Sequence, residues 1–355
     1  MSTLLEYKCP SCGGALSFDS SIQKMKCPYC DTEFDMDTLK SYDDALSKEP
    51  ETLEWDNQEP EQWDVPEGLV GYSCESCGGQ IISDINTIAT NCPYCENKVV
   101  MTGNVSGMLK PNYVIPFKLD KESAIKAFGD HLNKKRLLPK LFKKDTHIEE
   151  IKGIYVPFWL FDCHTDSDIN YKATKVSTWT SGSYRYKQTS HYLVSRSGVV
   201  DFQRIPVDGS KKMDDDLMDS IEPYNYNEMI DFQTAYLAGY MADKYDVTAY
   251  DNKDRVNERI KSSTVDRFRS TVVGYTTCVT RDTNIKISNS AIRYALLPVW
   301  LLNTTYHGQK YTFAMNGQTG KFVGNLPMDK GAFVRWFGGT FIVAAAITSI
   351  IALFL

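Results

Sequence analysis

Eight of the ten cysteines in this chain of 355 residues fall into two sets with the same spacing. Each set reads Cys-x2-Cys, fourteen further residues, then Cys-x2-Cys, and the second set lies 65 positions after the first. Between Tyr7 and Cys30, 11 of 24 positions are identical to the shifted copy. The two sets are Cys9, Cys12, Cys27 and Cys30, and Cys74, Cys77, Cys92 and Cys95. The N-terminal part of the chain is therefore a duplicated small module.

The spacing within each module is typical of a metal site. Two cysteines three positions apart on a tight turn direct both thiolates at one centre, and the glycine after Cys12 or Cys77 suits the positive φ of such a turn. Two turns complete a tetrahedral four-cysteine site, which supplies about 10 kcal/mol or more to a module too small to bury its own core. Iron also suits thiolates, but zinc is commoner in closed structural sites. Disulfides are disfavoured by the two Cys-x2-Cys pairs in each module and by the lack of a signal peptide, and a redox pair is disfavoured because the four cysteines recur as one set. The sequence predicts two structural Zn²⁺ ions, one in each zinc ribbon.

The distribution of charge argues against nucleic acid as the main partner. The net charge is −6, and the segment Asp35–Glu67 carries twelve acidic residues against two lysines. The second ribbon, Gly71–Val100, has one lysine and three acidic residues. Such surfaces repel phosphate. Trp55 and Trp63 stand among the acidic residues and either dock into a groove, on this protein or on a partner, or pack locally on a neighbouring domain.

The far end of the sequence predicts a membrane anchor. Residues Trp336–Leu355 form twenty consecutive positions without a charge, which as a helix span about 30 Å, the thickness of the hydrocarbon core. Lys330 and Arg335 precede this segment, and positive flanks face the cytoplasm. We expect a single-pass tail anchor in the cell membrane, with the N-terminal bulk in the cytoplasm, where cysteines stay reduced. A buried C-terminal helix of a soluble domain is the alternative.

The expected fold class is α+β. It comprises two small β-type zinc ribbons, a mixed middle domain with antiparallel strands, and one C-terminal transmembrane helix. The expected boundaries are 1–34 for ribbon 1, 35–69 for an acidic linker, 70–104 for ribbon 2, 112–330 for the middle domain and 336–355 for the anchor. Within the middle domain the patterns predict strands at 113–118, 151–163, 169–175, 184–194, 198–204 and 294–304, helices at 121–135 (capped by Asp120), 228–244 and 251–271, and a hairpin that turns at 316–320.

A weaker repeat lies inside the middle domain. Val156–Phe161 (VPFWLF) resembles Leu297–Leu302 (LPVWLL) at an offset of 141. We expect each proline to stand just ahead of a buried strand and each tryptophan to anchor the core. The pattern indicates two related β units with helices inserted between them, and it favours core packing over ligand binding.

A search for catalytic motifs finds none. Gly317–Lys321 (GQTGK) has two residues between its glycines where a phosphate-binding loop needs four, and it falls on a predicted hairpin. Asp162-Cys163-His164 places its cysteine and histidine on opposite faces of a strand. No GxSxG, HExxH or dinucleotide fingerprint is present. We therefore expect no enzymatic activity and no catalytic residues.

One basic stretch, Lys134–Lys144, has six basic residues in eleven. Its interleaved leucines and Phe142 would suit docking to anionic lipid headgroups. A solvated helix end followed by a loop is the alternative, and phosphate binding to RNA or DNA is a third.

Several motifs together resemble one group of bacterial membrane proteins. These motifs are CPSCGG…CPYC, YVIPF, IKGIYVPFWLFD, YLAGYMADKYDV and LLPVWLL…NGQTGK. The group is labelled as transcription-factor-IIB-type zinc-ribbon proteins, and the resemblance covers nearly the whole chain. The chain lacks the nucleotide-binding motif of a helicase and has no room for the cyclin-like repeats of a genuine transcription factor of that name.

In Gram-positive bacteria such as Bacillus, similar proteins are encoded beside phage-shock protein A and SPFH-domain membrane proteins. The resemblance implies recruitment of these scaffold proteins to stressed membrane, and it supplies no catalytic residues. The hypothesis from the sequence is a non-enzymatic, membrane-tethered zinc-ribbon adaptor that acts in envelope stress, with protein partners and with lipid around residues 336–355. The alternative is a membrane-associated nucleic-acid-binding zinc-ribbon protein.

Overall fold

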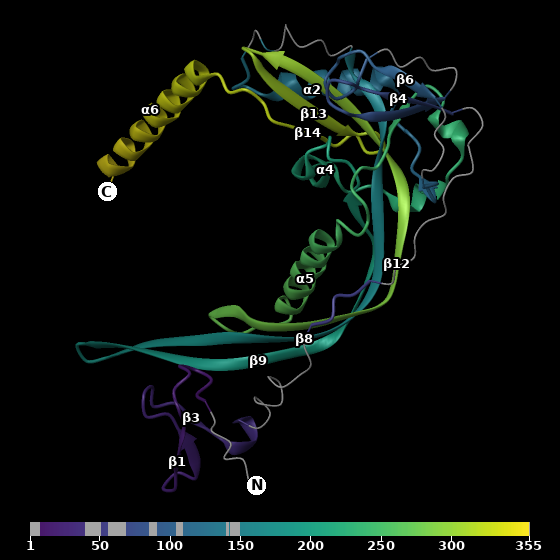
Figure 1. The fold of residues 1–355 in the computed structure, drawn as a ribbon. Helices are drawn as coiled ribbons and strands as arrows, with labels where there is room; N and C mark the ends of the chain where they lie inside the picture. Colours follow the sequence, from purple (N-terminus) through teal and green to yellow (C-terminus); the bar gives the residue numbers. More distant parts are fainter. Residues whose placement is uncertain are drawn as a thin grey trace. The chain divides into compact units, whose positions relative to one another are not determined.

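The computed structural model describes residues 8–39, 51–55, 69–84, 91–103, 109–139, 142 and 150–354. Most of the expected acidic linker, including Trp63, lies outside the described residues, as do Lys140, Leu141, Lys143 and Lys144 of the basic stretch. The chain forms two compact units, and the range 112–330 contributes to both. Unit 1 consists of Met1–Asn57, Asp162–Gln203 and Asp254–Ala291, and unit 2 of Gln58–Phe161, Arg204–Lys253 and Ile292–Leu355. The fold is α+β, as the sequence predicts, with mainly antiparallel strands and an apolar C-terminal helix (Figure 1).

Unit 1 contains the first ribbon and parts of three long strands. The ribbon is a three-stranded antiparallel sheet of β1 (Ser17–Asp19), β2 (Lys24–Lys26) and β3 (Glu33–Phe34). The long strands are β8 (Lys152–Ser181), β9 (Tyr184–Asp208) and β12 (Thr277–Tyr306), each of which contributes residues to both units. Helix α5 (Lys253–Arg269) packs Val265 and Phe268 against a buried cluster around Tyr171. The helix expected at 251–271 is therefore confirmed.

Unit 2 is built around the remaining strands of an 11-stranded sheet. The strand order is β10-β7-β12-β8-β11-β5-β4-β6, with β9 beside β8, and with β13 beside β12 and β14. Only the pairs β11–β8 and β12–β7 are parallel among the strand pairs with a described register. The bounds are β4 (Leu69–Ser73), β5 (Gln80–Asp84), β6 (Val100–Gly103), β7 (Tyr113–Val114), β10 (Ile230–Asp231), β11 (Met241–Asp243), β13 (Gln309–Asn316) and β14 (Phe322–Gly324).

The helices of unit 2 cover this sheet through short apolar faces. Helix α2 (Lys121–Lys134) begins where the sequence predicts, because the Asp120 carboxylate accepts a hydrogen bond from the Ser123 backbone at 2.8 Å. Its buried face, centred on Phe128, packs against Phe313 of β13. The other elements are α4 (Asp215–Ile221), the 3₁₀ turns η2 (Tyr226–Glu228) and η3 (Thr234–Leu237), and α6 (Lys330–Phe354).

The prediction of a helix at 228–244 is wrong. This segment instead contains η2, β10, η3 and β11. The last part of the segment, β11, is a strand of the sheet. Its Ala242 pairs with Tyr155 of β8 on one side and with Ile82 of β5 on the other. Gly239 precedes this strand with φ +82°, a conformation outside a right-handed helix. Pairing on both sides of β11 outweighs the helical spacing of apolar residues.

The internal repeat lies on two neighbouring strands, β8 and β12. Pro157 accepts a hydrogen bond from the Gly209 backbone at 2.8 Å, and Pro298 accepts one from Gly317 at 2.8 Å. Both prolines lie inside their strands, so the expectation that they stand ahead of the strands is wrong. The two tryptophans also make equivalent hydrogen bonds, because each indole N–H donates to a backbone oxygen. Trp159 donates to Val247 O at 2.9 Å, and Trp300 donates to Leu119 O at 3.1 Å. Both rings are buried, which confirms core packing.

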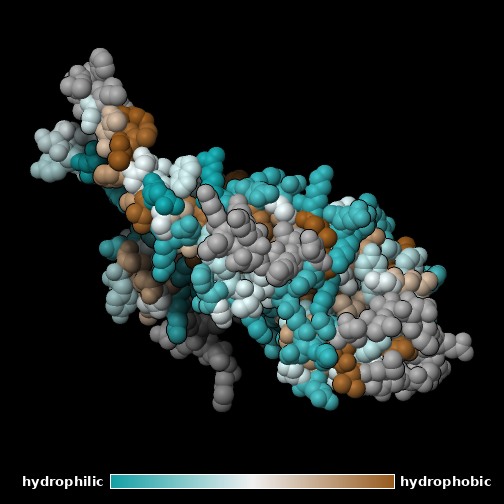
Figure 2. Space-filling view, turned by 90° about the horizontal axis from the view of Figure 1, so that it is seen from above, coloured by the Kyte–Doolittle hydropathy of each residue, from teal (hydrophilic) through white to brown (hydrophobic). Residues whose placement is uncertain are grey.

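Ribbon 1 exposes Phe18, Ile22, Tyr29 and Met36, and outside it two further segments of the described chain gather exposed apolar side chains. Hydrophilic residues predominate on the face drawn in Figure 2, where hydrophobic residues form small groups. One segment is the end of the β8–β9 hairpin, which exposes Trp179 and Tyr184. The other is α6, whose apolar residues from Phe333 to Ile347 stay exposed. Large exposed patches in a folded protein mark binding surfaces or membrane contact.

Candidate metal centres

The structure brings all eight predicted ligands together in two groups of four. Within each group the sulfur atoms lie within 4.8 Å of one another. The shortest Sγ–Sγ distances are 3.6 Å for Cys9–Cys30 and 3.4 Å for Cys12–Cys27 in ribbon 1. In ribbon 2 they are 3.4 Å for Cys74–Cys95 and 3.6 Å for Cys77–Cys92. Four sulfurs about 2.3 Å from one tetrahedral Zn²⁺ stand about 3.8 Å apart, so each group fits one zinc ion.

Each Cys-x2-Cys turn is held by the same pair of backbone hydrogen bonds. In ribbon 1, Cys9 N donates to Gly14 O at 2.7 Å and Gly13 N donates to Cys9 O at 2.8 Å. Bonds of the same kind close the turns at Cys27, Cys74 and Cys92. The residue after the second cysteine has positive φ in all four turns, namely Gly13 at 80°, Asp31 at 54°, Gly78 at 70° and Glu96 at 64°. The prediction that glycine serves this position is confirmed for the first turn of each ribbon.

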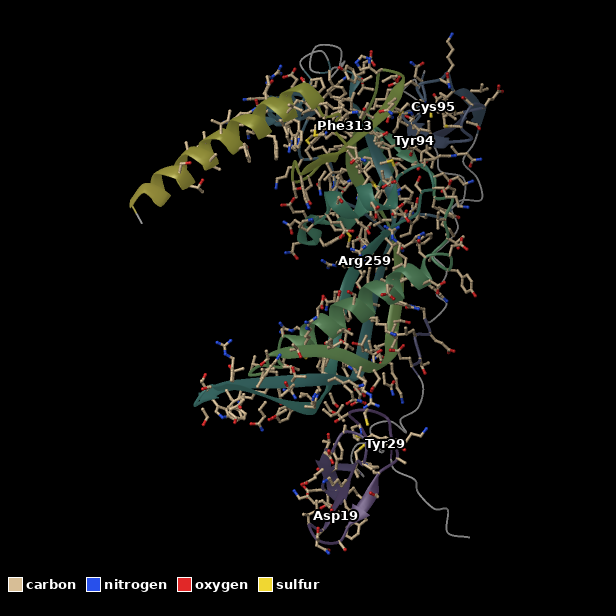
Figure 3. All side chains as sticks on the ribbon, turned by 90° about the vertical axis from the view of Figure 1, so that its left-hand side faces the viewer. Asp19, Tyr29, Tyr94, Cys95, Arg259 and Phe313 are labelled. Carbon is tan, nitrogen blue, oxygen red and sulfur yellow. The ribbon has the colours of Figure 1, made fainter. Side chains whose placement is uncertain are left out.

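The rest of the repeated motif serves packing around the sulfurs. A Cβ atom on Gly79 would lie 3.3 Å from Cδ2 of Tyr94 and 3.4 Å from Sγ of Cys77. A Cβ atom on Gly14 would lie 2.5 Å from Cδ2 of Tyr29. Each second glycine therefore makes room for the tyrosine of the PYC motif, which lies beside the last cysteine (Figure 3). The sequence shows that these glycines and tyrosines recur at the same offset, but it does not show that each glycine makes room for a tyrosine ring.

The electrostatic environment favours one thiolate in each group even before metal binds. The hydroxyl and backbone of Thr32 lower the pKa of Cys30 to about 6. Desolvation raises the pKa of Cys95, but hydrogen bonds from the Asn97 backbone and the other cysteines outweigh it and lower the pKa to about 7. These two cysteines occupy equivalent positions, 65 residues apart. Because metal binds the thiolate, each site has one ligand whose lowered pKa favours the metal-binding form near neutral pH.

Ribbon 2 is joined to the rest of unit 2 by side chains that sequence reasoning missed. Lys152 donates to Cys92 O at 3.2 Å, and Lys212 donates to Cys77 O at 2.5 Å. Asn303 donates to the backbone oxygens of Pro93 and Tyr94 at 2.7 and 3.3 Å. Four thiolates around Zn²⁺ carry a net charge of about −2, which the two lysines offset in part. No signal in one sequence links these residues, because they lie far from the cysteines along the chain.

The chemistry of both centres is that of closed structural sites. With a metal bound, the four thiolates of a group would fill all four tetrahedral positions and leave none for water or substrate, unlike a catalytic zinc site. The two groups differ in how far their cysteines are buried. Cys12 and Cys30 are exposed in ribbon 1, whereas the equivalent Cys77 and Cys95 are half-buried in ribbon 2. Metal in these centres would therefore stabilise the ribbons and would not take part in catalysis.

Other segments that drew attention in the sequence have structural roles. Gly317–Lys321 lies in the β13–β14 turn, where Asn316 Oδ1 accepts from the backbone of Gln318 and Thr319 at 2.9 Å each. Burial raises the pKa of Cys163 to about 12, the opposite of an activated nucleophile.

The tryptophan of the linker that the structure describes packs locally. The side chain of Trp55 is buried and donates to Asn257 Oδ1 of α5 at 2.8 Å. Of the interpretations left open by the sequence, Trp55 therefore follows the one in which the tryptophan packs locally on a neighbouring part of its own protein.

Only part of the basic stretch Lys134–Lys144 is exposed among its described residues. Lys134, Lys135 and Arg136 are exposed after the end of α2, which agrees with a solvated helix end. Leu138 and Phe142 are buried in the core with Phe313. The expectation that these apolar residues dock to lipid is therefore wrong.

Helix α6 is the one candidate membrane span in the part of the chain that the structure describes. The most apolar 18-residue window within Lys330–Ser349 has a mean hydropathy of 1.4, and apart from Ala332 no residue of this stretch is buried inside the protein. A core helix of a soluble protein would be mostly buried, so the alternative of a buried C-terminal helix loses its support. Length and composition fit a single crossing of a bilayer.

The comparisons with known proteins give a relative but no described fold or activity. No protein-family model matches the chain, and no solved structure matches it. The chain is 36% identical over 343 residues to the uncharacterized protein YdjG of Bacillus subtilis strain 168, and the similarity covers 96% of each chain. The protein therefore belongs to the same family as YdjG of Bacillus subtilis.

Proposed function

We propose that this protein is a non-enzymatic adaptor, tethered to the cell membrane by α6, that holds cytoplasmic scaffold proteins at the membrane during envelope stress. The proposal includes a cytoplasmic location for the bulk of the chain, supported by Lys330 and Arg335 at the start of α6. It includes kinship with transcription-factor-IIB-type ribbon proteins, supported by the four-cysteine groups. Scaffolds of the phage-shock protein A and SPFH-domain type are the partners that we propose.

The end of the β8–β9 hairpin is the observation that carries this proposal. Every residue from 177 to 189 is exposed, so this part of the hairpin contributes nothing to a core of its own chain. Trp179 and Tyr186 nevertheless stack on each other across the hairpin, with ring centroids 5.5 Å apart and planes 11° apart. A rigid pair of exposed aromatic rings costs little conformational entropy on binding and is typical of protein-binding surfaces.

The charge of the same hairpin indicates the kind of partner. Residues 169–200 contain five basic residues and no acidic one, although the whole chain carries −6. The basic residues are Lys172, Lys175, Arg185, Lys187 and Arg196. A partner with an acidic surface would be steered toward this hairpin and held in one orientation.

Affinity capture tests the adaptor. The tagged full-length chain is crosslinked in membranes of its own host, and the host's phage-shock protein A and SPFH-domain proteins are quantified by mass spectrometry. The double variant Trp179→Ala/Tyr186→Ala should reduce their recovery about thirtyfold, as expected for loss of a binding hot spot. Tyr250→Ala is the matched control, because Tyr250 is 70% exposed and lies outside the hairpin. Equal recovery with the double variant and the control would refute the hairpin as the docking surface.

A second candidate function rests on the same hairpin. Exposed aromatic rings among basic residues also suit single-stranded nucleic acid, which stacks its bases on such rings. This candidate predicts binding of a labelled oligonucleotide that weakens steeply with salt and is abolished by Arg185→Glu/Lys187→Glu. Retention of RNA or DNA in the capture experiment, without any scaffold protein, would favour it over the adaptor.

A further inference from the structure

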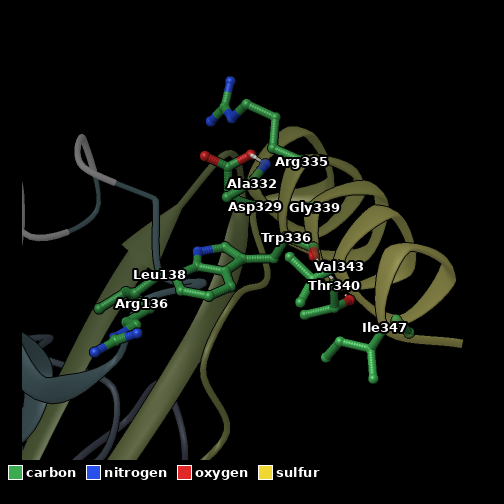
Figure 4. A pocket seen from close by; sticks show the side chains of 11 residues that line it. Arg136, Leu138, Asp329, Ala332, Arg335, Trp336, Gly339, Thr340, Val343 and Ile347 are labelled. Atoms are coloured by element: carbon green, nitrogen blue, oxygen red, sulfur yellow. Dashed lines mark hydrogen bonds between the residues drawn. The ribbon is translucent and has the colours of Figure 1, made fainter. Parts of the chain in front are cut away.

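A cavity lies between the first half of α6 and the loop that follows α2. Its volume is about 710 Å³, within the range of about 300–1,000 Å³ typical of ligand sites. Its lining includes two arginines, Arg136 and Arg335, whose guanidinium groups lie on opposite sides of Trp336, and Trp336, Val343 and Ile347 form an apolar wall (Figure 4). The cavity therefore offers cations at its polar end, beside Trp336, and hydrocarbon along the rest of its apolar wall.

The polar end of the cavity is held in place by the backbone. Asp329 N donates to Leu137 O at 2.8 Å, which ties the start of α6 to the loop. The Asp329 carboxylate accepts from Ala332 N at 2.9 Å and so caps the helix. The guanidinium of Arg136 lies 5.1 Å from the ring centroid of Trp336, a cation–π contact.

The apolar wall follows one face of α6 into the depth expected for a bilayer. Val343 and Ile347 lie seven and eleven positions after Trp336, or about 10 and 16 Å along the helix. Tryptophan favours the level of the lipid headgroups, so these residues lie at the level of the acyl chains. Gly339 leaves open space on this face, because a Cβ atom there would meet nothing within 4 Å.

The charge around the polar end is positive. A smaller adjoining cavity of about 290 Å³ is also lined by Arg136 and adds Lys134 and Lys135. Among the described residues that line the two cavities, Asp329 is the one acidic residue, and its carboxylate is engaged by the helix cap. Four cations against one engaged carboxylate match an anionic phosphate, and the apolar groove matches the chain attached to it.

We propose that this cavity binds one anionic phospholipid of the cytoplasmic leaflet, with its phosphate beside Arg136 and one acyl chain along Val343 and Ile347. The proposal rests on insertion of α6 into the membrane. Bound lipid fixes the angle at which α6 leaves the folded unit, because it fills the space between the helix and the loop.

The test uses the full-length chain purified in neutral detergent and titrated with phosphatidylglycerol or phosphatidylcholine, with bound lipid counted by native mass spectrometry. The parent protein should prefer phosphatidylglycerol, and Arg136→Gln/Arg335→Gln should weaken its binding about thirtyfold. Gly339→Leu should block the acyl chain with all charges kept. The control is Lys121→Gln/Lys126→Gln, which removes two exposed cations that line neither cavity and lie outside the hairpin.

Three results would overturn the lipid site. These are equal binding of the two lipids, full binding by the double variant, and displacement of the lipid by inorganic phosphate, which would indicate a site for free phosphate. Carbonate extraction of membranes separates this failure from failure of the tether. A chain released by carbonate refutes the membrane-spanning α6, whereas a retained chain without lipid preference refutes the lipid site alone.

Discussion

The two metal centres should contribute unequally to stability, although their ligand sets are equivalent. Cys27→Ser and Cys92→Ser remove the same ligand from ribbon 1 and ribbon 2, because the two positions correspond at the offset of 65. Loss of one thiolate from a structural zinc site removes most of the metal's contribution to folding. The difference between the variants then depends on what each ribbon holds together.

Ribbon 1 pairs its three strands only with one another among the described strands, whereas strands β4, β5 and β6 around ribbon 2 belong to the 11-stranded sheet. Four hydrogen bonds from Lys152, Lys212 and Asn303 end on the backbone of ribbon 2. At about 1 kcal/mol each, their loss costs roughly 4 kcal/mol. For a unit of this size, the midpoint of thermal unfolding falls by about 2–4 °C per kcal/mol. Cys92→Ser should therefore lower it by on the order of 10 °C.

The assay is thermal unfolding of the full-length protein in detergent, followed by near-ultraviolet circular dichroism, with zinc measured by elemental analysis. Both variants should fall from two zinc ions per chain to one, and only Cys92→Ser should shift the main transition. Equal shifts in the two variants would refute the reasoning that ribbon 2 is a built-in part of unit 2. Two ions per chain in either variant would show that the ligand assignment is wrong.

Three further outcomes follow from single features of the structure. Burial raises the pKa of Asp243 to about 7, so the folded chain keeps a proton that the unfolded chain releases at lower pH, and stability falls as pH rises toward 7. Between pH 6 and 8 the parent should lose about 1 kcal/mol of unfolding free energy and Asp243→Asn should not; equal losses in urea titrations, at constant zinc content, would contradict this. Gly79→Ala should weaken zinc retention against a chelator more than Gly14→Ala does. The added Cβ atom would come closer to a tyrosine ring at Gly14 than at Gly79, but that ring, Tyr29, is 75% exposed and can swing away. Stronger loss of zinc from Gly14→Ala would contradict this reasoning. Deletion of residues 336–355 should move the protein from the membrane pellet to the soluble fraction, and a truncated chain that stays in the pellet would point to a second membrane contact.

Much of the fold could be predicted where local rules decide. Asp120 marks the start of α2, because its carboxylate satisfies a free N–H group of the first turn. The β13–β14 hairpin turns at the expected Asn316–Gly320 segment, where Gly320 has φ +77°. The strand expected at 151–163 exists, but it is the start of the 30-residue β8. Its length depends on neighbours on both sides, which a window of sequence does not contain.

The sequence by itself determined the eight candidate metal ligands and the candidate span. Both depend on short-range spacing, since a Cys-x2-Cys turn aims its two sulfurs within a few residues and a helix needs only its own length of apolar side chains to cross a bilayer. Only the tertiary structure decided how the copies of the ribbon differ, which residues of the basic stretch are buried, and where Arg136 meets Trp336. These features join positions about 60 to 210 residues apart. Contacts of that kind arise from the global packing of strands and helices, so no local pattern encodes them.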